Sequence, residues 1–243
     1  MKVYTQEEFD ALPVVGEYKQ CPTGDYRRIS SFAERCSFGK QCRFGKQCRF
    51  GERCSFGEWC SFGKVCSFGE QCSFGERCSF GEQCSFGERC SFGERCSFGE
   101  RCSFGEQCSF GEVCSFGKVC SFGEVCSFGK VCSFGKVCSF GEVCSFGEWC
   151  SFGEWCSFEG KHKAKSGYPM ICISGVGSEN RTTYFFNTED GIIVRSGCFK
   201  GNLAEFRTKV RKDCPLGTEV KAIQYLGFAN IVAATWSPEQ IEK

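Results

Sequence analysis

A six-residue unit repeats without interruption through about half of the chain, and it constrains the fold more than any other feature. Cys occurs at every sixth position from Cys36 to Cys156, and a Phe lies two residues after each of these Cys. Written from the Phe, the unit is Phe-Gly-(Glu/Lys)-x-Cys-(Ser/Arg), in which x varies. A short fixed period of this kind indicates a solenoid, in which each unit packs on its neighbours.

The positions within the unit predict which side chains face the interior. Side chains alternate across a strand, so we expect Phe and Cys to point inward and Ser and x to point outward. Gly is expected at the turn, where it would tolerate a positive φ. Phe ladders would fill the corners, and Cys ladders would fill the flat walls. Three units would close a triangular coil, so the 21 units predict about seven coils and a rod roughly 34 Å long at ~4.8 Å per rung.

The unit resembles the left-handed β-helix hexapeptide family, with Phe standing where that family has Leu, Ile or Val. The resemblance covers residues 32–158 and implies a mainly β fold, a left-handed parallel β-helix. The "FGE-CS" array, together with "YFF…DGIIVRSGCFKGNLAEF", is also similar to uncharacterised proteins encoded by phages and prophages of gut bacteria. That second resemblance implies no activity.

The segments that flank the repeat predict a cap, a linker and a second domain. A solenoid has open ends that would pair with other chains, so residues 1–31 are expected to form a capping segment. Within it, "TQEEFDALP" predicts a short helix with Thr5 as N-cap and Glu8 at N3. Residues 159–169 are polar and basic, as is typical of a linker.

Residues 170–243 predict a small α+β domain. Strands are expected in "YPMICISG", "TTYFFN" and "IIVRS", with a tight turn at "NTEDG". Asn202 is the expected N-cap of a helix with Glu205 at N3, and a longer amphipathic helix is expected to open at Thr218.

The 25 cysteines are interpreted as reduced thiols that act as small apolar core residues. Metal chelation is the alternative, but a uniform spacing of six without paired knuckles is not the zinc-site pattern. No metal and no cofactor are expected.

Charge and hydropathy give little direction about partners. The net charge is +1, which makes direct binding of nucleic acid an unlikely function and gives no pull toward a membrane. The sequence "MKVYTQEEFDALP" lacks the apolar core of a signal peptide, and no stretch of about 18 apolar residues occurs. We therefore expect the protein to act in the cytoplasm, away from membranes.

One outward column is entirely acidic. The third position of the unit is Glu or Lys, and residues 18 apart are expected to lie on the same side of the coil. On one side this position is always Glu, and on the other two sides it is a mixture of Lys and Glu. The simplest interpretation is a solvated edge relieved by neighbouring arginines; the alternative is a recognition surface for a basic partner, including mimicry of nucleic-acid charge. This acidic row consists of Glu34, Glu52, Glu70, Glu88, Glu106, Glu124 and Glu142.

The x position changes from polar to apolar along the repeat. It is chiefly Arg or Gln up to residue 107, with Trp59 and Val65 as exceptions, and apolar beyond that point on all three sides. Such a patch is expected to be covered by a second copy of the chain or by the C-terminal domain; the alternative is that Val merely favours strands. This apolar belt consists of Val113, Val119, Val125, Val131, Val137, Val143, Trp149 and Trp155.

Catalysis is not expected. Hexapeptide-repeat proteins are often trimeric acyltransferases with a catalytic His between coils, but the one histidine here, His162, falls in the linker. Cys198 has no His or acid placed in sequence to activate it and is expected to be a buried strand-end residue. Ice binding by the regular Ser columns is a further alternative. The leading hypothesis is a non-catalytic, homo-oligomeric interaction protein, phage-encoded, which binds itself or a host protein and could inhibit a host factor.

Overall fold

The computed structural model describes residues 1–147, 149–153, 156–158, 162–163, 165, 169–176, 181–213 and 220–238. The chain divides into two compact units, Met1–Lys161 and His162–Lys243.

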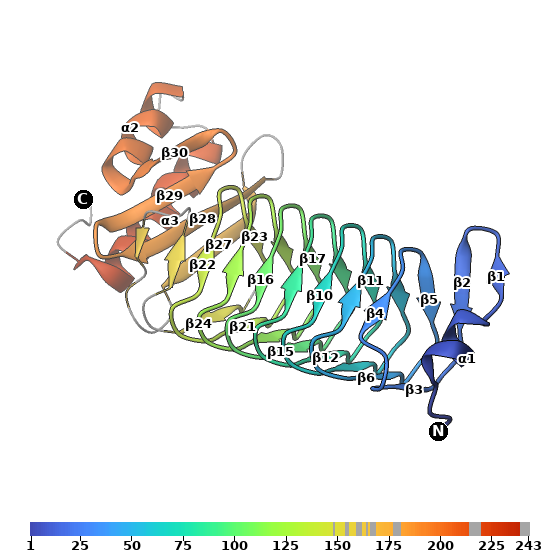
Figure 1. Cartoon of the computed structure of the whole chain (residues 1–243). Coiled ribbons are helices and arrows are strands. Elements are labelled where there is room, and N and C mark those ends of the chain that lie inside the picture. Colours follow the sequence, from blue (N-terminus) through green and yellow to red (C-terminus); the bar gives the residue numbers. More distant parts are fainter. Residues whose placement is uncertain are drawn as a thin grey trace. The chain divides into compact units, whose positions relative to one another are not determined.

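The first unit is a parallel β-solenoid whose three walls are each a sheet of two- to four-residue strands (Figure 1). Sheet I contains β1 (Val14–Val15), β2 (Tyr18–Cys21), β5 (Cys36–Phe38), β8 (Ser55–Phe56), β11 (Ser73–Phe74), β14 (Ser91–Phe92), β17 (Ser109–Phe110), β20 (Ser127–Phe128) and β23 (Ser145–Phe146). Sheet II contains β3 (Asp25–Tyr26), β6 (Arg43–Phe44), β9 (Ser61–Phe62), β12 (Ser79–Phe80), β15 (Ser97–Phe98), β18 (Ser115–Phe116), β21 (Ser133–Phe134) and β24 (Ser151–Phe152). Sheet III includes β4 (Ser31–Phe32), β7 (Arg49–Phe50), β10 (Ser67–Phe68), β13 (Ser85–Phe86), β16 (Ser103–Phe104), β19 (Ser121–Phe122), β22 (Ser139–Phe140) and β25 (Ser157–Phe158).

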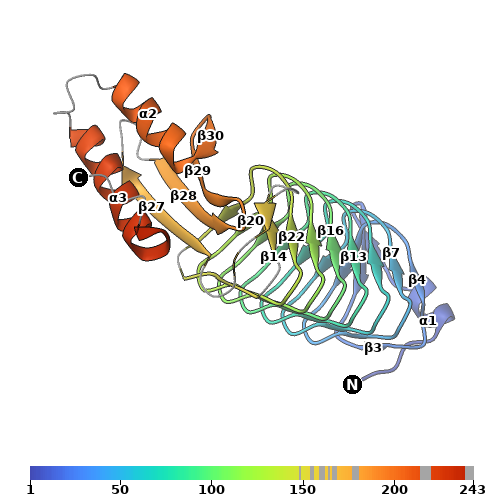
Figure 2. The ribbon, with the colours of Figure 1, turned by 90° about the vertical axis from the view of Figure 1, so that its left-hand side faces the viewer.

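Each coil takes one strand from each sheet and stacks in register on the coil 18 residues before it, as with Ser73↔Ser91 and Phe74↔Phe92 (Figure 2). The predicted mainly β parallel solenoid is confirmed. It has eight coils from β2 to β25, one more than expected, because residues 18–32 form a coil ahead of the first repeat unit. The hand of the coil stays a prediction.

Phe side chains form the centre of the solenoid. Along one wall, the rings of Phe74 and Phe92 stack 4.8 Å apart with an interplanar angle of 2°. Between walls, the rings of Phe80 and Phe86 meet edge to face at 5.1 Å. Both arrangements are favourable for aromatic pairs. Because the strands are Ser-Phe pairs, Phe lies on the walls and Cys lies beside the corners, the reverse of the expected placement.

The 21 repeat cysteines are buried and free, as predicted. Each thiol from Cys54 onward lies against a backbone carbonyl of the coil before it, and Cys90 Sγ, for example, donates to Gly69 O at 3.5 Å. The inward thiols therefore also satisfy backbone acceptors near the corners.

The corners are built differently from the prediction. Positive φ belongs to x, not to Gly: φ lies between 56° and 64° at the x positions from Arg35 to Trp149. Gly is required for another reason, because a Cβ on Gly93 would lie 2.7 Å from Glu76 N in the coil before it. The glycines thus allow successive coils to approach closely.

The N-terminal end of the solenoid is closed by the predicted helix, α1 (Gln6–Asp10). Thr5 and Glu8 form the expected capping box. The ring of Phe9 on this helix packs edge to face on Phe32 at 5.2 Å and on Tyr26 at 6.3 Å. The aromatic stack therefore ends beneath a helix rather than in solvent.

The second unit contains the short strand β26 (His162–Lys163) and an antiparallel sheet of β27 (Met170–Val176), β28 (Arg181–Thr188), β29 (Gly191–Ser196) and β30 (Phe199–Asn202). Helices α2 (Leu203–Asp213) and α3 (Val220–Trp236) follow, and residues such as Phe185, Val194, Phe206 and Val232 form its core. The three predicted strands are confirmed, whereas β30 was not predicted. The expected capping box is present, since Glu205 N donates to Asn202 Oδ1 at 2.9 Å. Thr218 lies outside the described residues.

Candidate interaction surfaces

Three corners carry nearly all of the sequence variation of the solenoid. We call them corner I–II, corner II–III and corner III–I, after the sheets that each one joins. Every corner displays one Glu or Lys and one x side chain per coil, and x is held outward by its left-handed backbone. The walls display mainly Ser. The corners are therefore the places where the surface can be changed without altering the interior.

The apolar belt is exposed in the chain. Val119 is 48% and Trp149 83% solvent-accessible, and the other belt valines lie between 45% and 58%. Trp155 lies outside the described residues. Two belt residues fall on corner III–I, Val125 and Val143, and the remaining described ones divide between corners I–II and II–III. The predicted outward orientation is confirmed for the seven described belt residues, and whether they are covered in solution stays a prediction.

Strand preference does not explain the belt valines. Their φ is near 60°, as at Val119 (62°) and Val137 (62°), whereas Val favours strands because of its stiffness in extended backbone. The left-handed region costs an ordinary L-residue about 1–2 kcal/mol, and a β-branched residue there is an outlier. Val therefore stands at a position that disfavours it, six times in succession. That alternative interpretation is wrong.

The acidic row occupies corner III–I throughout the repeat, and all seven of its glutamates are exposed. The other corners place ion pairs between successive coils: Lys40 Nζ lies 3.0 Å from Glu58 Oε1, and Lys64 Nζ lies 2.8 Å from Glu82 Oε1. Stacked glutamates offer no such pair along the row. Corner III–I is thus the one corner of the repeat where like charges are stacked in every coil.

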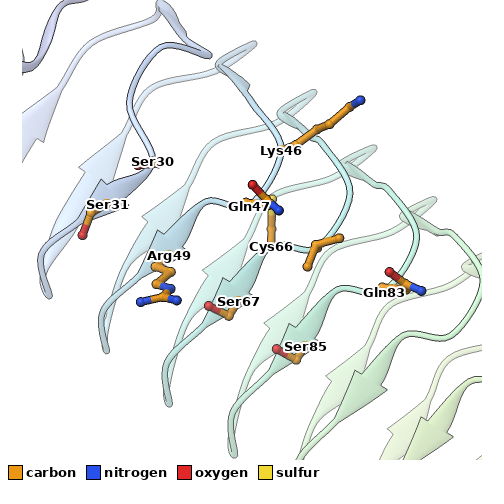
Figure 3. Close-up of a pocket in the computed structure, with 10 residues that line it drawn as sticks. Ser30, Ser31, Lys46, Gln47, Arg49, Cys66, Ser67, Gln83 and Ser85 are labelled. Carbon is orange, nitrogen blue, oxygen red and sulfur yellow. The ribbon is translucent and has the colours of Figure 1, made fainter.

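A basic surface was missed by the sequence analysis. Sheet III has a groove of about 650 Å³ lined by Ser30, Ser31, Lys46, Gln47, Arg49, Val65, Cys66, Ser67, Gln83 and Ser85 (Figure 3). Arg replaces the Ser of the unit in two consecutive repeats, at Arg43 on sheet II and at Arg49 in the groove, and this is the trace that the groove leaves in the sequence. Averaging the charge over the whole solenoid concealed it.

Of the two residues considered for catalysis, the structure describes the side chain of Cys198 only. The side chain of His162 lies outside the described part of the structure. Cys198 is exposed rather than buried, because it falls in the tight turn between β29 and β30, next to Gly197 with φ 57°.

The expectation that helix α3 is amphipathic is wrong. Apolar side chains lie on its exposed side as well, since Ile223 and Ile231 are 59% and 57% solvent-accessible.

The thiols of Cys90 and Cys132 are poor nucleophiles, whereas hydrogen bonds from neighbouring thiols lower the pKa of others, such as Cys96 and Cys126. The neighbouring thiol of Cys114 and burial raise the pKa of the Cys132 thiol to about 12. Neighbouring thiols and burial likewise raise the pKa of Cys90. A thiol that stays protonated neither attacks nor binds metal readily at neutral pH.

Comparison with known families gives one match, in the repeat. The profile of an RNA-binding, Nab2-type zinc finger matches residues 41–57, 47–63, 59–75, 66–87, 77–93, 83–99, 90–111, 107–129 and 144–158. Neither a curated protein nor a solved structure matches the chain.

The residues in the matched stretches do not fit a zinc finger. Such a finger needs three Cys and a His around one ion, and the only histidine, His162, lies outside every matched stretch. Consecutive cysteines such as Cys84, Cys90 and Cys96 precede strands of three different walls. Within the described residues, no group of three or more His, Cys, Asp or Glu side chains could hold a metal ion. The match reflects the cysteine spacing alone.

No helix among the described residues is both long and apolar enough to cross a membrane.

Proposed function

We propose that the solenoid is a non-catalytic binding scaffold whose apolar belt associates with a second copy of the chain. The observation that carries this proposal is the run of valines at exposed corners with left-handed backbone. Arg and Gln occupy the same position in the first half, so the fold does not need Val there. Burying apolar surface contributes roughly 25 cal/mol per Å², which would repay the backbone strain in an assembled state.

The position of the belt on all three corners favours association between copies of the chain over coverage of the belt by the C-terminal domain. The belt reaches all three corners, and a single small domain docked on one wall would leave the others exposed. Association between copies places the same patch on each of two partners, as in most closed oligomers. In this proposal the chain acts in the cytoplasm of a bacterial host, as its resemblance to phage-encoded proteins suggests.

Variants that restore the polar form of the corner test the proposal. Changing Val119, Val131 and Val143 to Gln, one on each corner, is expected to reduce the molar mass measured by light scattering to that of a monomer. The circular dichroism spectrum should not change, because Gln occupies x elsewhere in the same fold. Val65→Gln is the matched control outside the belt and should leave the mass unchanged. A wild-type chain that is monomeric at all concentrations would contradict the proposal.

The acidic row supports a second candidate function, binding of a basic partner. The observation in its favour is the stacking of glutamates in every repeat coil on one corner only. Glu70, Glu88 and Glu106 changed together to Gln should weaken binding of a lysine-rich peptide. The same change at Glu76, Glu94 and Glu112 on corner I–II removes equal charge and serves as control. If both variants weakened binding of the peptide equally, the acidic row would not be the binding site.

A further inference from the structure

The first coils of the repeat depart from it in a direction that the fold does not require. Ser precedes Phe at Ser37 and in every unit from Ser55 to Ser157, whereas Arg43 and Arg49 hold this position in two consecutive units. Both arginines are exposed, so neither fills the interior. The other units show that Ser would serve the fold equally well.

Positive charge is concentrated in the same stretch. Residues 27–53 contain eight basic and two acidic residues, whereas residues 54–112 contain five basic and nine acidic ones. A chain with a net charge of +1 thus holds a local excess of positive charge at one end of the solenoid. Such an excess attracts anions through the summed field of its charges.

The groove on sheet III presents these charges together with hydroxyl groups. Ser31, Arg49, Ser67 and Ser85 lie on four successive strands, and Lys46 enters from corner II–III. Figure 3 shows Arg49, Ser67 and Ser85 projecting from the same face of the wall. Four rungs extend over roughly 14 Å at ~4.8 Å per rung, so the groove is a linear series of donors rather than a compact pocket.

The cations in the groove lack an ion-pair partner among the residues that the structure describes. Neither Lys46 nor Arg49 forms an ion pair with any residue that the structure describes, in contrast to Lys40 and Lys64, which pair with glutamates in the next coil. Arg28 precedes Lys46 by 18 residues, one turn of the solenoid, and is also exposed and outside those pairs. Like charges on successive coils repel unless an anion lies between them.

We propose that this basic groove, defined by Ser31, Lys46, Arg49, Ser67 and Ser85, binds the phosphodiester backbone of a nucleic acid. Guanidinium, ammonium and hydroxyl groups are the side chains that proteins use to contact phosphate oxygens. The residues lining the groove include no aromatic side chain on which a base could stack. Binding is therefore to the backbone and independent of base sequence.

An acidic peptide fits the groove less well. Peptides are commonly held by strand addition at a free sheet edge or by apolar pockets. Here β7 and β10 are each paired on both sides, which leaves no edge in the groove, and Val65 is the one apolar aliphatic residue in its lining. The proposal goes beyond self-association of the apolar belt and rests on different residues.

Fluorescence anisotropy with a labelled DNA oligonucleotide of mixed sequence tests the groove. Wild-type protein is expected to bind at low salt, with an affinity that falls as salt rises, because each neutralised phosphate contributes roughly 0.7–0.9 to the log–log slope. The variant K46E/R49S changes the two cations of the groove and gives each site a residue that other units carry there. It should weaken binding at least about tenfold and make the salt dependence shallower.

The control is R77Q/R89Q/R95Q, which lowers the net charge by the same three units outside both the groove and the belt. It should keep affinity within about twofold of wild type, which would show that position rather than total charge decides binding. Inorganic polyphosphate should displace the oligonucleotide, and poly-glutamate of similar length should not. Absence of wild-type binding, equal loss in both variants, or equal displacement by poly-glutamate would each overturn the proposal.

Discussion

The two halves of the solenoid share one interior and differ at their corners. Stacked rings lie 4.8 Å apart at Phe74 and Phe92 in the first half, and 4.9 Å apart at Phe116 and Phe134 in the second. The x position is chiefly Arg or Gln in the first half and Val or Trp in the second, on all three corners. The comparison therefore separates the residues that make the fold from those that are free to carry a function.

Alkaline pH tests the shared interior and has the largest expected effect. One group of interior thiols, which includes Cys90 and Cys132, has a pKa that is raised in the folded chain, to about 12 at Cys132, whereas the pKa of another group, which includes Cys96, is lowered. The alkaline transition concerns the first group. Their contribution to stability is present below about pH 8.5, the pKa of a free thiol, and is lost as pH rises toward 12, because the unfolded thiols release protons first. Circular dichroism should show the whole solenoid unfolding in one transition in this window. Persistence of one half at pH 12 would contradict a common interior.

Removal of one buried Phe ring should lower the free energy of unfolding by the same amount in either half of the solenoid. Phe92→Ala and Phe122→Ala each empty a buried site at the centre of the solenoid, and a buried Phe replaced by Ala typically costs about 3–5 kcal/mol. Denaturant unfolding measures both. Costs that differ by more than about 1 kcal/mol would show that the corners influence the core.

Exchange of Val and Gln at the x position should change the stability of the monomer slightly, with opposite sign in the two halves of the solenoid. Val119→Gln relieves a β-branched residue at φ 62°, and Gln83→Val introduces one at φ 60° on the same corner. We expect the monomer to be stabilised by about 1 kcal/mol in the first case and destabilised by a similar amount in the second. Unfolding below the concentration at which the chains associate provides the measurement. If both variants changed the stability of the monomer in the same direction, the claim that the left-handed backbone disfavours Val at x would be wrong.

The interior could be predicted from the sequence because every unit of the repeat has Phe and Cys at the same two positions. Alternation predicted correctly that Phe and Cys point inward and that Ser and x point outward, although only Ser and Phe belong to a strand and Cys and x belong to the corner. The caps at Thr5 and Asn202 were also predictable, because an N-cap and its N3 partner are local in sequence.

The corners could not be predicted, because their geometry depends on the coil 18 residues away. Gly93 is fixed by the backbone at Glu76 rather than by its own φ, and no pattern within the unit reveals that contact. The left-handed backbone at x is equally hidden, since Arg, Gln, Val and Trp all occur there. The basic groove becomes visible only when Lys46 and Arg49 are placed beside Ser67 and Ser85 from later units.

Hydroxyl-radical footprinting of the wild-type protein across a range of concentrations tests self-association most directly. Val65 and Val119 occupy the same corner and are equally exposed in the chain, at 46% and 48%. The account predicts equal oxidation at low concentration and selective protection of Val119, with the other belt valines, as concentration rises. Equal oxidation at every concentration, or protection of Val119 that does not depend on concentration, would contradict it.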